Sequence, residues 1–229
     1  MPRWEPPADG FVANGNNPPV GRAFPEPLPR YGWLQDRALR MAERLEADRE
    51  ITLDDLRSIQ TDVRSRAALR IVPRLIACAD SVAERLTDRQ RQAIAILRGW
   101  NGDALRREIA PTLYRAWYGA YLRRSGFEDA PGMGLAALEG RAPAELKLPG
   151  SAAPERAADA VVAALDTALV RLAALLGEDP SAWTWERSHR ARFRHELAWF
   201  DSAFAPPTIG MDGDNHTPAV GRSNLPWST

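Results

Sequence analysis

Near its start the chain carries the stretch GFVANGNNPP, residues 10–19, which separates a short strand candidate from a long series of helical patterns. Residues 10–14 have the aromatic and β-branched composition of a strand. Three asparagines, Asn14, Asn16 and Asn17, then fall within four positions, and two prolines follow. Asparagine suits a turn because its amide bonds nearby backbone groups and because it tolerates the left-handed conformation. By itself the stretch therefore predicts a strand that ends in a turn.

Beyond this turn the sequence is dominated by amphipathic helices, because apolar residues recur at helical spacing. Thr87 and Gln90 have the spacing of a capping box, and Pro73 is expected to open a helix because proline is tolerated in the first turn. Residues 127–154 are expected to form a loop with one helical turn at 135–138. The predicted helices cover residues 34–45, 53–63, 73–86, 87–99, 113–122, 157–176 and 189–201.

The chain is therefore predicted to be mainly α and to have three parts. Residues 1–33 form a Pro/Asn-rich segment with the short strand, residues 34–204 form the helical region, and residues 205–229 form an irregular segment.

Composition excludes several classes of function. The 229 residues carry 30 basic and 30 acidic side chains, so neither nucleic acid nor an anionic membrane is expected as a partner. Cys78 is the only cysteine, which excludes an internal disulfide and a cysteine zinc cluster. No apolar run reaches the length of a membrane span, and the first residues lack the apolar core of a signal peptide.

Candidate catalytic groups are few. No Gly-x-Ser-x-Gly elbow occurs. The spacing of His189 and His195 does not place both rings on one helical face, so structural or surface histidines are favoured over metal ligands. The acidic stretch 212–217, which includes His216, lacks the ligand spacing of an EF-hand and is interpreted as a turn. Taken alone, these residues predict no self-sufficient active site and no metal site.

The stretch 10–19 resembles the G-[FY]-[IV]-A-x-x-N-N-x-P motif of the penicillin acylase family, N-terminal nucleophile hydrolases that cleave amide bonds. In that family the first asparagine of the pair helps to form the oxyanion hole, which makes Asn16 a catalytic candidate. The element from Trp33 to Arg37 is similar to one whose arginine lies near the active site, so Arg37 is a second candidate. The other interpretation of Arg37 is a surface ion pair of little energetic weight. Further motifs follow in the family's order within residues 59–75, 97–102, 185–197 and 213–217.

The resemblance implies that the chain is a fragment of the four-layer αββα fold. In the family a serine exposed by precursor cleavage attacks the amide, and its own α-amino group acts as the base. Here the chain opens with Met1 and the asparagine pair follows after few residues. The chain is therefore expected to be an interior β-chain segment without the nucleophilic serine, inactive alone. Family members often bind a structural calcium whose ligands lie mostly elsewhere, so no cofactor is expected here.

Two functional hypotheses follow. The first is a segment of a penicillin-acylase-type amidohydrolase that acts on the side-chain amide of β-lactams or related N-acyl compounds. Its partners would be that substrate and the remainder of the acylase α- and β-chains, and full-length members of the family are periplasmic or secreted. The alternative is a non-enzymatic helical interaction module. A large exposed apolar surface would favour the first hypothesis, and a closed helical domain would favour the second.

Overall fold

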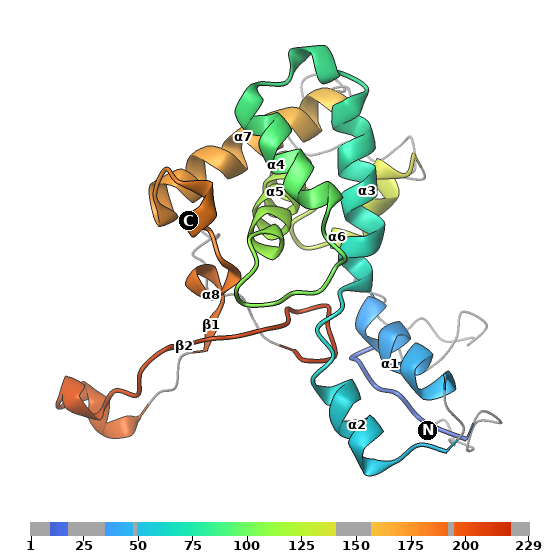
Figure 1. The fold of residues 1–229 in the computed structure, drawn as a ribbon, viewed down its shortest axis with the longest axis vertical. Coiled ribbons are helices and arrows are strands. Elements are labelled where there is room, and N and C mark those ends of the chain that lie inside the picture. The colour runs from blue at the N-terminus through green and yellow to red at the C-terminus, as the bar shows by residue number, and fades with distance from the viewer. Residues whose placement is uncertain (1–9, 18–34, 48–49, 141–156, 192–194, 221–229) are drawn as a thin grey trace.

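The structure is a computed structural model that describes residues 10–17, 35–47, 50–140, 157–191 and 195–220. The chain is mainly helical, as predicted, and its described helices are shown in Figure 1. The α-helices are α1 (Asp36–Glu46), α2 (Leu53–Gln60), α3 (Arg66–Asp80), α4 (Asp88–Arg98), α5 (Ala110–Arg124), α6 (Pro131–Leu138), α7 (Ala157–Leu176) and α8 (Trp185–Ser188). The short 3-10 helices are η1 (Ala83–Arg85), η2 (Pro180–Ala182), η3 (Glu196–Trp199) and η4 (Ser202–Phe204).

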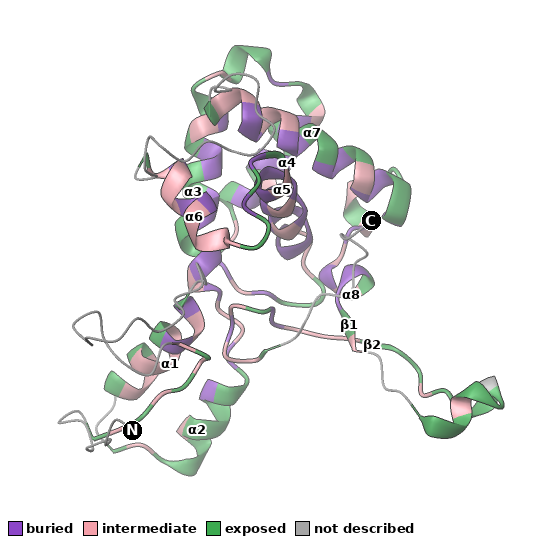
Figure 2. Ribbon diagram, turned by 180° about the vertical axis from the view of Figure 1, so that it is seen from behind, coloured by how far each residue is buried: buried purple, intermediate pink, exposed green. Residues whose placement is uncertain are grey.

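Helix α5 forms the centre of the core, and α3, α4, α6 and α7 pack around it (Figure 1). Its most extensive contact is with α7, where the buried Trp117 indole donates to the Val161 carbonyl at 2.9 Å. Burying a large apolar side chain contributes roughly 1.5–3 kcal/mol, so this seam is a main source of stability. Figure 2 shows buried residues concentrated in these helices, whereas α2 is mostly exposed.

Local signals position several of these helices as predicted. The capping box at α4 is present, because Thr87 accepts from the Gln90 amide while Gln90 accepts from the Thr87 amide. Helix α7 spans the predicted residues 157–176, and Gly177 follows it with a positive φ of 97°. These features depend on residues within one helical turn of each other, which explains why they could be predicted from the sequence.

Four local predictions were wrong. Pro73 lies inside α3 rather than at a helix start, because Ser65 caps this helix eight residues earlier by accepting from the Ala68 amide at 3.2 Å. Residues 10–14 form no strand, since no described strand pairs with them. The turn expected at 135–138 is the longer helix α6.

The helix expected at residues 189–201 is also interrupted. Strand β1 (Arg190–Ala191) pairs antiparallel with β2 (Ile209–Gly210), with Arg190 opposite Gly210 and Ala191 opposite Ile209. The amide of Met211 donates to the His189 carbonyl at 3.0 Å, so this backbone is bonded between segments rather than within a helix. The two strands lead to an arm that carries η3 and η4 away from the helical core (Figure 1).

Backbone hydrogen bonds join three segments between α1 and the core. The amide of Ala104 donates to the Val63 carbonyl at 2.9 Å, and the amide of Gly213 donates to the Ala104 carbonyl at 2.7 Å. The amide of Ala219 donates to the Asp62 carbonyl at 2.9 Å. These bonds bring residues more than a hundred positions apart in the chain next to each other, between α1 and the core.

None of the described helices is both long enough and apolar enough to cross a membrane. Most of the predicted segment 1–33 lies outside the described residues, as do Trp33 and most of the predicted loop 141–154. The predicted division into parts at residues 33 and 204 stays a prediction.

Candidate functional site

The asparagine turn at residues 14–17 is held by its own side chains. Asn14 Oδ1 accepts from the Asn16 amide at 2.9 Å, and Asn17 Oδ1 accepts from the Gly15 amide at 3.0 Å. Asn16 itself has a positive φ of 63°, a left-handed conformation that asparagine tolerates better than most residues. Two of the three asparagines therefore build the turn, and the side chain of Asn16 is left to make contacts outside it.

The turn packs directly on the first turn of α1. A Cβ added at Gly15 would lie 2.7 Å from the backbone nitrogen of Ala38, closer than side chains approach a backbone. Only glycine permits this approach. The position of Asn16 therefore depends on where α1 begins.

Asn16 and Arg37, the two residues predicted to be catalytic, are in contact. The Nη2 group of Arg37 donates to the Gly15 carbonyl at 2.9 Å and to Asn16 Oδ1. The alternative considered from the sequence was a surface ion pair of Arg37. Among the described residues, no carboxylate forms an ion pair with Arg37.

The contact with Arg37 orients the side-chain amide of Asn16. A guanidinium can only donate, so the amide oxygen of Asn16 must face Arg37 and its NH2 group must point away. Asn16 is exposed, so this NH2 group is open to a ligand. The pair therefore presents an oriented neutral hydrogen-bond donor at the surface beside α1.

Three buried polar side chains have atoms that lack hydrogen-bond partners, and one of them, Asp36, is the first residue of α1. Asp36 and Tyr114 are fully buried and His189 almost so, yet Asp36 Oδ2, the Tyr114 hydroxyl and both ring nitrogens of His189 have no hydrogen-bond partner. Such orphaned buried groups are uncommon in folded proteins. Nothing in the sequence indicated this burial, since Asp36 has the pattern of an acidic residue in an exposed first turn.

The histidines occupy structural positions in the described residues. His189 stacks on Trp185 with ring centroids 4.6 Å apart, and burial lowers its pKa, which the charge of Asp214 only partly opposes. Burial also lowers the pKa of His216, again opposed by Asp214. His195 is exposed, and its Nδ1 accepts from the Leu197 amide at 3.2 Å. None of these rings contacts a described serine hydroxyl.

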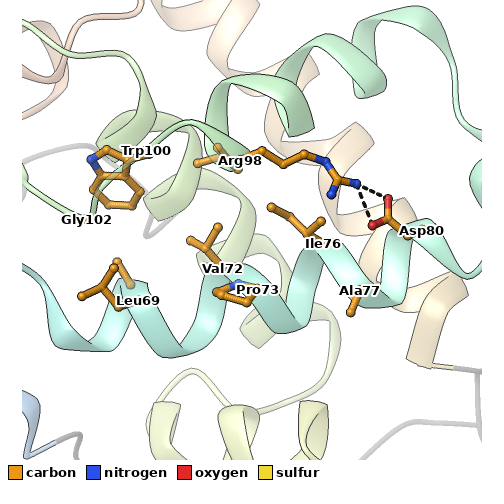
Figure 3. Close-up of a pocket in the computed structure, with 11 residues that line it drawn as sticks. Leu69, Val72, Pro73, Ile76, Ala77, Asp80, Arg98, Trp100 and Gly102 are labelled. Carbon is orange, nitrogen blue, oxygen red and sulfur yellow. Dashed lines mark hydrogen bonds and ion pairs between the residues drawn. The ribbon is translucent and has the colours of Figure 1, made fainter.

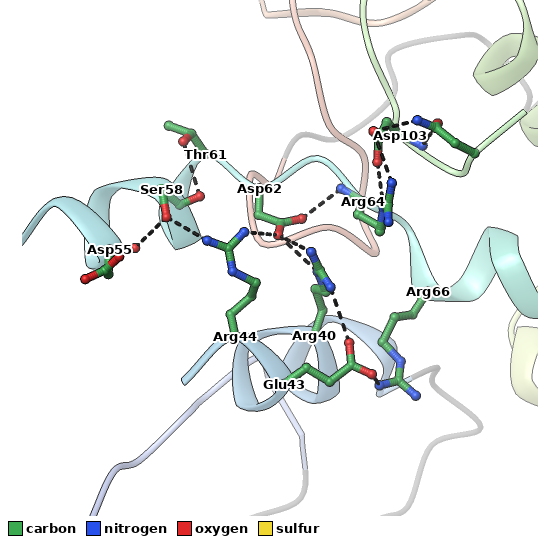
Figure 4. Close-up of polar contacts among 11 residues, drawn as sticks. Arg40, Glu43, Arg44, Asp55, Ser58, Thr61, Asp62, Arg64, Arg66 and Asp103 are labelled. Carbon is green, nitrogen blue, oxygen red and sulfur yellow. Dashed lines mark hydrogen bonds and ion pairs between the residues drawn. The ribbon is translucent and has the colours of Figure 1, made fainter. Parts of the chain in front are cut away.

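A polar network centred on Asp62 holds α1, as Figure 4 shows. Asp62 Oδ2 accepts from Arg40 Nη2 at 2.7 Å and from Arg44 Nη1 at 3.1 Å, and Asp62 Oδ1 accepts from the Arg64 amide at 2.9 Å. Arg64 in turn pairs with Asp103 at 2.8 Å. The sequence identified Asp62 only as part of a motif, and this network joins α1 to the segment before α3.

The stretch 212–217 is a turn, as interpreted from the sequence. Asp214 Oδ1 accepts from the His216 amide at 2.6 Å, and the Asp214 amide donates to the Thr217 hydroxyl at 2.8 Å. Across the described part of the chain, no group of three or more histidine, cysteine or acidic side chains is arranged to hold a metal ion. The expectation that this chain holds no cofactor stays a prediction, and no step is assigned to a metal.

A separate groove of about 420 Å³ lies between α3 and α4 (Figure 3). Its walls are mainly apolar, and Arg98 Nη2 donates to both oxygens of Asp80 at 2.5 and 2.6 Å at one end. Neither Asn16 nor Arg37 lines it. The lining residues are Ala68, Leu69, Val72, Pro73, Ile76, Ala77, Asp80, Leu97, Arg98, Trp100 and Gly102. With its two charged side chains bonded to each other and no nucleophile or base, this groove is not a site for acyl-transfer chemistry.

Comparison with known proteins identifies the family. A family model described as Penicillin amidase matches residues 1–228, nearly the whole chain. No curated protein matches the sequence at a significant level. The match covers both Asn16 and Arg37 and all the motifs that carried the resemblance, and it supports a function of amidohydrolase type. The chain belongs to the penicillin amidase family.

Proposed function

We propose that Asn16 supplies the side-chain N–H that stabilises the oxyanion when an N-acyl amide is hydrolysed, and that Arg37 orients this donor. The observation that carries the proposal is the bond from Arg37 to Asn16 Oδ1, which leaves the NH2 group free and exposed. An oxyanion hole needs donors held in place before the charge develops, because no reorganisation is then needed during reaction. The Asn16–Arg37 pair meets this requirement.

The chemistry we propose is acyl transfer to an N-terminal serine that is not among these 229 residues. The serine oxygen bonds to the carbonyl carbon, its proton passes to its own α-amino group, and the carbonyl oxygen becomes the anion that Asn16 stabilises. Collapse of this intermediate breaks the carbon–nitrogen bond, and the amine leaves with the proton. Water then hydrolyses the acyl-enzyme and releases the acid.

Three of the described serine hydroxyls donate to backbone carbonyls, which supports placing the nucleophile elsewhere. Ser58 donates to the Asp55 carbonyl at 2.8 Å, Ser81 to the Cys78 carbonyl at 2.7 Å, and Ser188 to the Trp185 carbonyl at 3.1 Å. A hydroxyl bonded in this way has no base to accept its proton.

The proposed substrates are the side-chain amides of β-lactams or related N-acyl compounds, and the proposed partner is the remainder of the acylase α- and β-chains. The arm beyond β1 supports such a partner, because it exposes several large apolar side chains close together in the sequence. They are Leu197, Trp199, Phe200 and Phe204. Exposed apolar groups of this kind are typical of contact surfaces.

Hydrolysis of a chromogenic phenylacetyl amide by the natural gene product tests the proposal. We expect Asn16→Ala to lower kcat by about 10²–10³, the loss found when one oxyanion donor is removed. The matched control is Asn215→Ala, at an exposed asparagine in the 212–217 turn. An unchanged kcat in Asn16→Ala would refute the oxyanion role. Full activity from the 229 residues alone would refute the assignment of the nucleophile to a serine outside them.

A further inference from the structure

The start of α1 is anchored in an unusual way. Its N-cap residue, Gln35, makes no side-chain capping bond, and the first helical residue, Asp36, is fully buried. The only other buried residue of this helix is Ala38. A buried carboxylate is unfavourable unless it is paired. Here Asp36 Oδ1 accepts from Arg70 Nη1 of α3 at 3.1 Å.

A second ion pair joins the same two helices. Glu43 of α1 pairs with Arg66 of α3, one helical turn before Arg70. Asp36 and Glu43 lie two turns apart on one face of α1. Two contacts on one face fix the rotation of a helix about its axis as well as its position, so the direction of every other α1 side chain is fixed with them.

Arg37 follows Asp36 and therefore points about 100° further around the helix. This direction takes its guanidinium to Gly15 and Asn16. A guanidinium about 7 Å from the helix axis would move by about 2.5 Å if α1 rotated by about 20°. Such a shift breaks hydrogen bonds, which weaken steeply with distance and angle. The orientation of the Asn16 amide thus depends on the rotation of α1.

We propose that Asp36 is a positioning residue for Asn16: through its ion pair with Arg70 it fixes the rotation of α1, and so the direction in which Arg37 holds the Asn16 amide. This inference rests on the proposed function of Asn16 as an oxyanion donor. No described contact joins Asp36 to Asn16 or to the turn at residues 14–17. We propose that Asp36 acts only through the position of α1.

The surroundings of Asp36 make Arg70 hard to replace as its partner. Asp36 Oδ2 and the Tyr114 hydroxyl are both buried without a hydrogen-bond partner. The pKa of Tyr114 is raised well above its ordinary value, first by burial and to a smaller extent by neighbouring charges that include Asp36. The carboxylate therefore faces the α5 core, and Arg70 is the only hydrogen-bond partner that the described residues provide for it.

The test measures the Asn16 side-chain amide by NMR in the full ¹⁵N-labelled chain, with the resonance assigned by its loss in Asn16→Ala. Arg70→Met removes the partner of Asp36, and Arg57→Met is the matched control because Arg57 forms an exposed pair with Asp54 on α2. We expect Arg70→Met to lower the order parameter of the Asn16 side-chain amide to below about 0.6, the range of flexible groups. Arg57→Met should leave it unchanged, and Arg70→Lys should restore part of it.

Asp36→Asn is the second variant, because it removes the charge and keeps the shape. We expect the same loss of order at Asn16 while circular dichroism shows the helices intact. An unchanged Asn16 amide in both folded variants would overturn the proposal. Loss of the whole fold in both would also overturn it, because Asp36 would then have a general structural role. Failure of the oxyanion role would appear separately, as an Asn16→Ala enzyme with unchanged kcat.

Discussion

Replacing Asp62 with asparagine tests the network that joins α1 to the segment before α3. Asparagine keeps the shape of the side chain, but it removes the charge that faces Arg40 and Arg44. The carboxylate accepts from these arginines at 2.7–3.1 Å and is only 4% exposed. Charge-assisted hydrogen bonds contribute roughly 1.5–3 kcal/mol each. Because both arginines remain partly exposed and can be hydrated, we take the lower value for each and expect a loss of about 3 kcal/mol.

Urea denaturation of both proteins at pH 7 measures this loss as a change in the free energy of unfolding. A loss of about 3 kcal/mol is large against the 5–15 kcal/mol typical of a domain. The control is Asp54→Asn on α2, where the carboxylate is 87% exposed in its pair with Arg57. An exposed pair of this kind contributes about 0–1 kcal/mol, so this control should unfold almost like the wild type.

The pH dependence provides a second measurement. Burial acts to raise the pKa of Asp62, but the hydrogen bonds from Arg40 and the Arg64 amide and the charges of Arg40 and Arg44 hold it below its ordinary value. A lowered folded-state pKa stabilises the protein above the unfolded pKa of about 3.9, and this stabilisation is lost as the pH falls through the folded value. The difference between wild type and Asp62→Asn should therefore be constant from about pH 5 to 7 and shrink below about pH 4. A difference below about 0.5 kcal/mol at pH 7, or one that grows in acid, would refute the reasoning.

Two further substitutions test the packing around the candidate site. Gly15→Ala would place a Cβ 2.7 Å from the Ala38 nitrogen, so we expect a loss of about 1–3 kcal/mol in urea denaturation and a shifted Asn16 amide resonance. Gly99→Ala, with no atom closer than 3.8 Å, is its control, and equal stability of the two variants would contradict the expected clash. Tyr114→Phe removes a buried hydroxyl without a partner, so stability should stay equal or rise by up to about 1 kcal/mol, and a clear loss would show that the hydroxyl is bonded.

Local structure was largely predictable for helices whose signals lie within a few residues. The capping box of Thr87 and Gln90 satisfies the first amides of α4 whatever surrounds it, and the apolar face of α7 follows from its spacing. Pro73 was misplaced by the same kind of reasoning. A proline is compatible with the first turn of a helix, but Ser65 provides an earlier cap, and the helix continues through Pro73.

The candidate site could be predicted only in part. The motif at residues 10–19 named Asn16, and the element before α1 named Arg37, but neither pattern states that the two side chains meet. Their contact depends on Gly15 packing against Ala38 and on the rotation of α1. Both depend on contacts between segments far apart in the chain, which no local pattern encodes.

The sequence by itself determined that the chain is mainly helical, where α4 and α7 form, and which family its motifs resemble. Helix propensity and helix caps depend on residues close together in the sequence, so they favour the same helix whatever the surrounding fold. Only the tertiary structure decided that Asp36 is buried, that Asp62 gathers two arginines, and that the 10–14 segment is not a strand. A strand needs a partner and a buried charge needs a counterion, and both are provided by residues distant in the chain.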